Sequence, residues 1–147
     1  MLDTDYLRKA LAALPEFRDT SLQVHASDGY DGVISILANI RGTAFPCTVL
    51  EDRSSGELGC RPGGVDSYSL VLWVMDMKGR DEPESAVYAR TFSLAKRIVR
   101  LLVHDSREHF PGLDITSVPY NRRQGGPGCY GYELVLTVFD DIDLSYE

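Results

Sequence analysis

The fold is decided by residues 68–77, YSLVLWVMDM. Large apolar side chains fall on both sides of an alternating pattern, which is typical of a strand that is covered on both faces. One side carries Tyr68, Leu70, Leu72 and Val74, and the other carries Val71, Trp73, Met75 and Met77. We therefore expect a central strand that packs against helices on one face and against something else, such as a neighbouring subunit, on the other.

Helical spacing of apolar residues appears before and after this strand. Residues 2–14 fit a helix that ends at Pro15, and the longest helix is expected over residues 84–105. The acidic first turn and basic later half of the long helix suit the helix dipole. Its apolar side chains span an arc of roughly 200°, which is wider than one contact with a sheet requires.

Residues 33–40 fit a helical face and a strand alternation almost equally well. Asp31 can act as a helix cap, and Gly42 lies just beyond Arg41, where a helix commonly stops. These two signals favour a helix, and a strand stays open as the alternative.

Four further segments are expected to be strands, namely residues 21–25, 45–50, 113–118 and 130–139. The last two are expected to form an antiparallel pair around a turn-rich segment, residues 121–128. Residues 51–66 contain many glycine and polar residues, so we expect a long mobile loop there. Residues 141–147 are expected to form an acidic C-terminal tail.

The composition is that of an ordinary globular protein, because 44% of the 147 residues are hydrophobic and 25% are charged. This length suits one domain, residues 1–147, which buries a core without disulfide bonds. The expected class is α+β, with a mixed, mainly antiparallel sheet of about four to five strands. A long helix and one or two shorter helices are expected to pack on that sheet.

Charge and local sequence exclude several classes of function. The net charge of −7 argues against non-specific binding of nucleic acid. The longest apolar runs are about six residues, too short to span a membrane, and the N-terminal sequence does not resemble a secretory signal. Three cysteines without a CxxC pair fit a reducing compartment better than a disulfide framework.

No arrangement of residues predicts catalysis, a cofactor or a metal site. His104 and His109 match no established metal-ligand spacing, and nothing places a base beside a cysteine. We expect Cys47 and Cys129 to be small apolar strand residues and Cys60 to lie in a loop without a role. The protein is accordingly predicted not to be an enzyme.

A stripe of basic side chains on the long helix contains no acidic residue, which is unexpected on an acidic chain. Its members are Arg90, Lys96, Arg97, Arg100 and His104. We expect the stripe to pair with acidic residues of an adjacent copy, with Asp141 as a candidate partner, and solvation of the helix surface is the alternative. The expected subunit interface comprises Arg90, Lys96, Arg97, Arg100, Trp73 and Asp141.

Three segments resemble the bacteriophage tail terminator family. Residues 44–51, AFPCTVLE, are similar to the first long strand of that family, and residues 67–74, SYSLVLWV, to the strand after its flexible loop. Residues 115–138 are similar to its final hairpin. The order of elements also resembles the family, with a helix, a strand that opens with Phe-Pro, a long loop, a strand with Trp, a long helix and two closing strands.

The resemblance implies a structural protein of phage or prophage virion assembly. Such a protein forms a homo-oligomeric ring, often a hexamer, that terminates the tail tube and contributes to head-tail joining. The implied partners are further copies of the chain and other tail or neck proteins. Neither a membrane nor a nucleic acid is expected as a partner. The implied locations are the bacterial cytoplasm during assembly and the virion tail. The alternative is a homodimeric α+β module that binds a ligand or peptide without catalysis.

Overall fold

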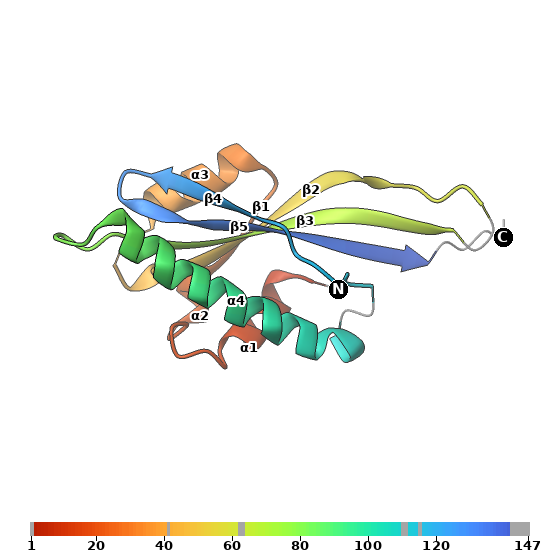
Figure 1. Cartoon of the computed structure of the whole chain (residues 1–147), viewed down its shortest axis with the longest axis horizontal. Coiled ribbons are helices and arrows are strands. Elements are labelled where there is room, and N and C mark those ends of the chain that lie inside the picture. The colour runs from red at the N-terminus through yellow and green to blue at the C-terminus, as the bar shows by residue number, and fades with distance from the viewer. Residues whose placement is uncertain (1, 41, 62–63, 110–111, 115, 142–147) are drawn as a thin grey trace.

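Five strands form one mixed sheet in the order β1-β2-β3-β5-β4 (Figure 1). The computed structural model describes residues 2–40, 42–61, 64–109, 112–114 and 116–141, with the backbone alone at residues 43, 52–54, 107, 109, 140 and 141. Strand β1 (Val24–Ser27) is parallel to β2 (Cys47–Glu57). Strands β3 (Val65–Met77), β5 (Cys129–Asp141) and β4 (Tyr120–Gly126) follow, each antiparallel to its neighbour.

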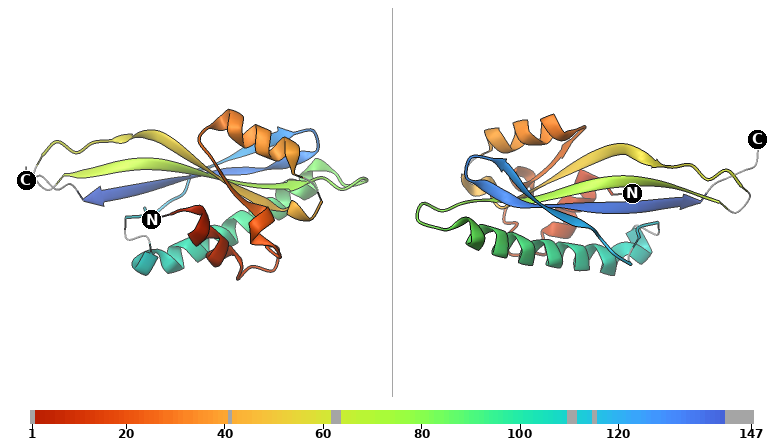
Figure 2. Two further views of the ribbon diagram at one scale, coloured as in Figure 1. Left: turned by 180° about the vertical axis from the view of Figure 1, so that it is seen from behind. Right: turned by 45° about the horizontal axis from the view of Figure 1, so that its top comes forward.

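The helices lie on both faces of this sheet (Figures 1 and 2). Helices α1 (Thr4–Leu11), α2 (Thr20–Gln23) and α4 (Glu84–His109) cover one face, and α3 (Tyr30–Asn39) covers part of the other. A 3-10 turn at Gly42–Ala44 leads into β2. The α+β class, the mainly antiparallel sheet and the long helix are therefore confirmed.

Strand β3 is buried on both faces, as its pattern predicts. Leu70, Leu72 and Val74 join the core beneath α1 and α4. Trp73 and Met75 join a second core beneath α3. The cover over this second face is thus supplied by the same chain around Trp73.

The helix expected over residues 33–40 is confirmed, although α3 begins earlier, at Tyr30, and its cap residue is Gly29. Val33 and Leu37 are buried one turn apart on the face that meets the sheet. This helical spacing, and not the strand alternation, therefore determines the burial.

Two of the expected strands are displaced. Most of residues 21–25 lie in α2, because the Asp19 carboxylate accepts hydrogen bonds from the backbone N–H and the hydroxyl of Ser21 and thereby caps a helical turn. Of residues 113–118, those that the structure describes contribute only an isolated bridge, Leu113 to Val138. The strand that pairs with β5 is instead β4, which occupies most of the segment expected to be a turn. Because the side chains of β4 are mostly polar, its sequence shows no alternation of apolar residues that would predict a strand. Pairing with β5 determines its conformation.

The long loop expected over residues 51–66 is largely strand. β2 continues to Glu57 and pairs with β3, with an irregularity between Asp52 and Gly56. A side chain at Gly56 would overlap the backbone carbonyl of Ser67, so this glycine allows close approach of two strands. The glycine content was therefore wrongly interpreted as a sign of a loop.

The ends of β2, β3 and β5 extend past the helices as a three-stranded ribbon (Figures 1 and 2). Three large apolar side chains on this ribbon are exposed: Leu58 by 80%, Val65 by 40% and Phe139 by 44%. At its tip the Gly59 N–H donates to the Asp66 carboxylate at 2.9 Å. We call residues 57–60 the ribbon tip.

The three cysteines differ in accessibility, which gives a first test of the fold. Cys47 and Cys129 are buried strand residues, as expected, and Cys60 is exposed. Burial raises the pKa of Cys129 to about 12 and that of Cys47 well above its ordinary value, so both thiols stay protonated at neutral pH. A thiol reagent should therefore modify only Cys60 in the folded chain, as measured by mass spectrometry. A Cys60→Ser variant should react only after unfolding, and fast reaction of the folded variant would contradict the burial of the other two.

Candidate functional site

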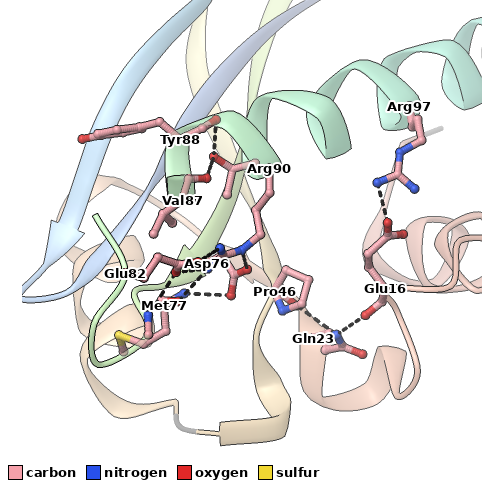
Figure 3. A network of polar contacts seen from close by, with 12 residues as sticks. Glu16, Gln23, Pro46, Asp76, Met77, Glu82, Val87, Tyr88, Arg90 and Arg97 are labelled. Carbon is pink, nitrogen blue, oxygen red and sulfur yellow. Dashed lines mark hydrogen bonds and ion pairs between the residues drawn. The ribbon is translucent and has the colours of Figure 1, made fainter. Parts of the chain in front are cut away.

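A pocket of about 400 Å³ lies between the first half of α4, the loop after α1 and the adjoining ends of β2 and β3. Apolar groups and charged groups of both signs line it. The lining residues are Pro15, Glu16, Arg18, Pro46, Asp76, Arg90, Thr91, Leu94 and Arg97. Figure 3 shows much of the surrounding polar network. We call this cavity the α4 pocket.

Gln23 joins two walls of the α4 pocket. Its side chain is fully buried, and its amide nitrogen donates to the backbone carbonyls of Glu16 at 2.8 Å and Pro46 at 2.9 Å (Figure 3). Its amide oxygen accepts from the Asp19 N–H at 2.8 Å. These bonds fix the loop after α1 against the start of β2.

Arg90 fastens the start of α4 to the end of β3. Its Nε donates to Asp76 at 2.6 Å, and its two terminal nitrogens donate to the two oxygens of Glu82 at 2.5 and 2.8 Å. One terminal nitrogen also donates to the backbone carbonyl of Met77 at 3.0 Å. The hydrogen bond from Arg90 lowers the pKa of Glu82 to about 2, with help from the Gly79 N–H. The pKa of Arg90 is raised, chiefly by its bond to Glu82.

Arg97 lies about two turns further along α4 and forms an ion pair with Glu16 (Figure 3). Burial is the largest influence on the pKa of Glu16 and would raise it, but the hydrogen bond and charge of Arg97 help to bring it below its usual value. The second carboxylate oxygen of Glu16 is buried and has no hydrogen-bond partner among the described residues. Arg90 and Arg97 therefore both have acidic partners within their own chain.

Arg18 differs from the other two arginines of the α4 pocket. Its side chain is exposed, and within the described part of the chain it makes no hydrogen bond or ion pair. Because Arg90 and Arg97 are neutralised by carboxylates, Arg18 supplies the pocket's available positive charge.

The structure does not bring the six expected interface residues together. Lys96 lies on another side of α4, 5.2 Å from the ring centre of Phe92, and Arg100 is exposed one turn beyond it. Trp73 is fully buried on the α3 side, where its indole N–H donates to Glu51 at 2.8 Å. The side chain of Asp141 lies outside the described residues.

The wide apolar arc of α4 has an explanation within the chain. One flank of the helix packs against aromatic residues of β4 and β5, with ring centres between 5.1 and 5.9 Å apart. The cluster comprises Tyr88, Phe92, Tyr120, Tyr130 and Tyr132. The guanidinium of Arg122 lies 4.2 Å from the ring centre of Tyr88. More than one face of the α4 helix therefore contacts the sheet.

Sequence reasoning missed the acidic and amide partners in the α4 pocket. Glu16 and Gln23 belong to segments that gave no signal for a site. Asp76 and Glu82 lie at the end of a strand and in the following turn, where charged residues are ordinary. The tertiary contact between α4 and the end of β3 brings Asp76 and Glu82 to Arg90. No helical or strand periodicity in the sequence predicts that contact.

Comparisons with known proteins assign no family to this chain. No protein-family model matches it, and a search of curated proteins gives no match. Within the described residues, no three His, Cys, Asp or Glu side chains are grouped to hold a metal ion. No helix in that part of the chain is both long and apolar enough to cross a membrane.

The buried amide of Gln23 should be important for stability. Gln23→Ala leaves the Glu16 and Pro46 carbonyls and the Asp19 N–H without this partner, so we expect a loss of about 2–3 kcal/mol in the free energy of unfolding. Guanidinium denaturation measures the change. The exposed Gln124→Ala serves as the control, with an expected change under about 0.5 kcal/mol. Equal effects of the two substitutions would contradict the role of Gln23.

The bond between Arg90 and Glu82 should make stability depend on pH. Because the pKa of Glu82 is lowered from 4.5 to about 2 on folding, its contribution is complete above pH 4.5 and is lost as the pH falls towards 2. The stability difference between the wild type and Glu82→Gln should therefore shrink across this window, as measured by urea denaturation. Glu108→Gln, exposed near the end of α4, is the matched control. A difference for Glu82→Gln that is constant from pH 6 to about 2 would contradict the assignment.

Proposed function

We propose that this chain is a phage or prophage tail assembly protein that forms an oligomeric ring, terminates the tail tube and contributes to head-tail joining. The observation that carries the proposal is the ribbon of β2, β3 and β5 that projects past the helices and exposes Leu58 at its tip (Figure 1). Val65 and Phe139 are exposed on the same ribbon, and several exposed apolar groups on one projecting element are typical of a site of contact between proteins. On this proposal the chain acts through its interfaces and has no catalytic role.

The backbone of the ribbon also favours assembly. β1 pairs with β2 only from Thr48 to Glu51, so the outer edge of β2 from Asp52 to Glu57 has no strand partner among the described residues. Unpaired strand edges offer rows of N–H and C=O groups to other chains. The exposed edge and the exposed Leu58 lie on the same end of the molecule, so one contact with another copy can cover both.

The assignment to a tail terminator rests on the resemblance of residues 44–51, 67–74 and 115–138 to that family. Most of the described residues in these three segments lie in β2, β3 and the β4–β5 pair. The mixed sheet with a long helix on one face is consistent with it. The implied further partners are tail or neck proteins.

The α4 pocket favours a second candidate, a dimeric module that binds a ligand or peptide without catalysis. Its volume of about 400 Å³ lies within the range of small-molecule sites, and it combines apolar walls with charged groups. Oligomeric state separates the two candidates, because the module requires only a fixed dimer.

Light scattering after size-exclusion chromatography tests the proposal. We expect a mass of more than two 16.4 kDa chains, which rises with concentration until one closed species is reached. Negative-stain micrographs should show rings. A fixed dimer at all concentrations would favour the binding module. A monomer at millimolar concentration would contradict the ring.

A further inference from the structure

We infer that the ribbon tip of one copy docks in the α4 pocket of the next copy, with Leu58 against the pocket's apolar walls and Glu57 beside Arg18. This inference rests on the proposed ring and names the contact that would build it. It differs from the interface expected from the sequence, since Arg90 and Arg97 keep their internal partners.

The ribbon tip presents Leu58 in a defined position. The side chain is 80% exposed, and the bond from the Gly59 N–H to Asp66 holds the adjoining turn. Glu57 precedes Leu58, is exposed, and makes no hydrogen bond or ion pair within the described residues. Two consecutive residues of the tip thus offer one exposed carboxylate and one exposed apolar side chain.

The α4 pocket is complementary to these two groups. Pro15, Pro46 and Leu94 give it an apolar wall, and its volume of about 400 Å³ accommodates a leucine side chain with room for the adjoining backbone. Arg18 at the same pocket carries a guanidinium without a partner in the described part of the chain. A carboxylate beside it would form a charge-assisted hydrogen bond, while the leucine leaves water.

The positions of the two surfaces require a second copy. Asp66 lies at the tip end of β3 and Asp76 at the pocket end, and ten residues of strand separate them by about 30 Å. A tip therefore cannot reach the pocket of its own chain. Because the contact joins two different surfaces, it is head-to-tail, and repetition gives a closed ring or an open filament.

Substitutions at the tip test the contact in the full-length chain. Leu58→Asp should weaken self-association at least about tenfold in sedimentation equilibrium, because a charge replaces the docked apolar group. Ser35→Asp, exposed on α3 and on the other face of the sheet from the pocket, adds the same charge but retains Leu58 and the ribbon edge, and should associate like the wild type. Glu57→Arg and Arg18→Glu should each weaken association, and the double variant should recover much of the loss. Circular dichroism checks that each variant is folded.

The exposed Cys60 allows a direct test of proximity. Pro15→Cys adds a thiol at the pocket and retains Arg18, so mild oxidation should link Cys60 of one copy to this thiol of the next and give a ladder of covalent oligomers. Asp28→Cys, an exposed site outside the pocket, should give no ladder, and neither should Pro15→Cys combined with Cys60→Ser.

The outcomes separate this inference from the proposed function. Suppose that the wild type forms rings, that Leu58→Asp still forms them and that Pro15→Cys gives no covalent ladder. This result would overturn the docking contact but not the proposed ring. A wild-type chain that stays monomeric would overturn both. Rings that are lost in Leu58→Asp and linked through Pro15→Cys would support both.

Discussion

The pairing of β3 with β5 is the constraint on which the rest of the structure depends. It joins every residue of β3, from Val65 to Met77, to a partner on β5 without a break. The half of this ladder that lies beneath the helices is buried on both faces. The other half continues past the helices, where β3 is the middle strand of the ribbon and β5 one of its edges. A single long pair of strands thus supports both the core and the projecting surface.

The sequence predicted those elements whose burial repeats at a regular period. The alternation around Trp73 predicted β3, and the apolar positions of α4 predicted the long helix. For α3 the spacing fitted a helix and a strand almost equally, and only the signals at Asp31 and Gly42 favoured the helix. Such patterns indicate which side chains of a segment are buried against the core formed by the neighbouring elements. They are most reliable where one segment contributes many buried side chains.

The sequence failed where contacts with distant residues determine the conformation. β4 is polar and exposed along most of its length, and it is a strand because β5 pairs with it, with Asn121 and Arg123 both donating to Glu133. Gly56 indicated a loop by composition, although close packing against Ser67 explains it. Likewise, the basic stripe appeared unpaired because the carboxylates that meet Arg90 and Arg97 lie outside the long helix. In the candidate site the sequence therefore singled out Arg90 and Arg97, but not Arg18, the acidic groups or the shape of the pocket.

The single tryptophan has a consequence for how such a chain can be studied in solution. Trp73 is fully buried on the α3 side, bonded to Glu51 and 5.7 Å from the ring centre of Tyr30, whereas the α4 pocket opens on the other side of the sheet. Its fluorescence emission should therefore report the integrity of the core and be nearly insensitive to what binds the pocket or the ribbon. An intrinsic optical signal for folding is thus separated in space from the surfaces proposed for association, so the two equilibria can be monitored independently in one sample.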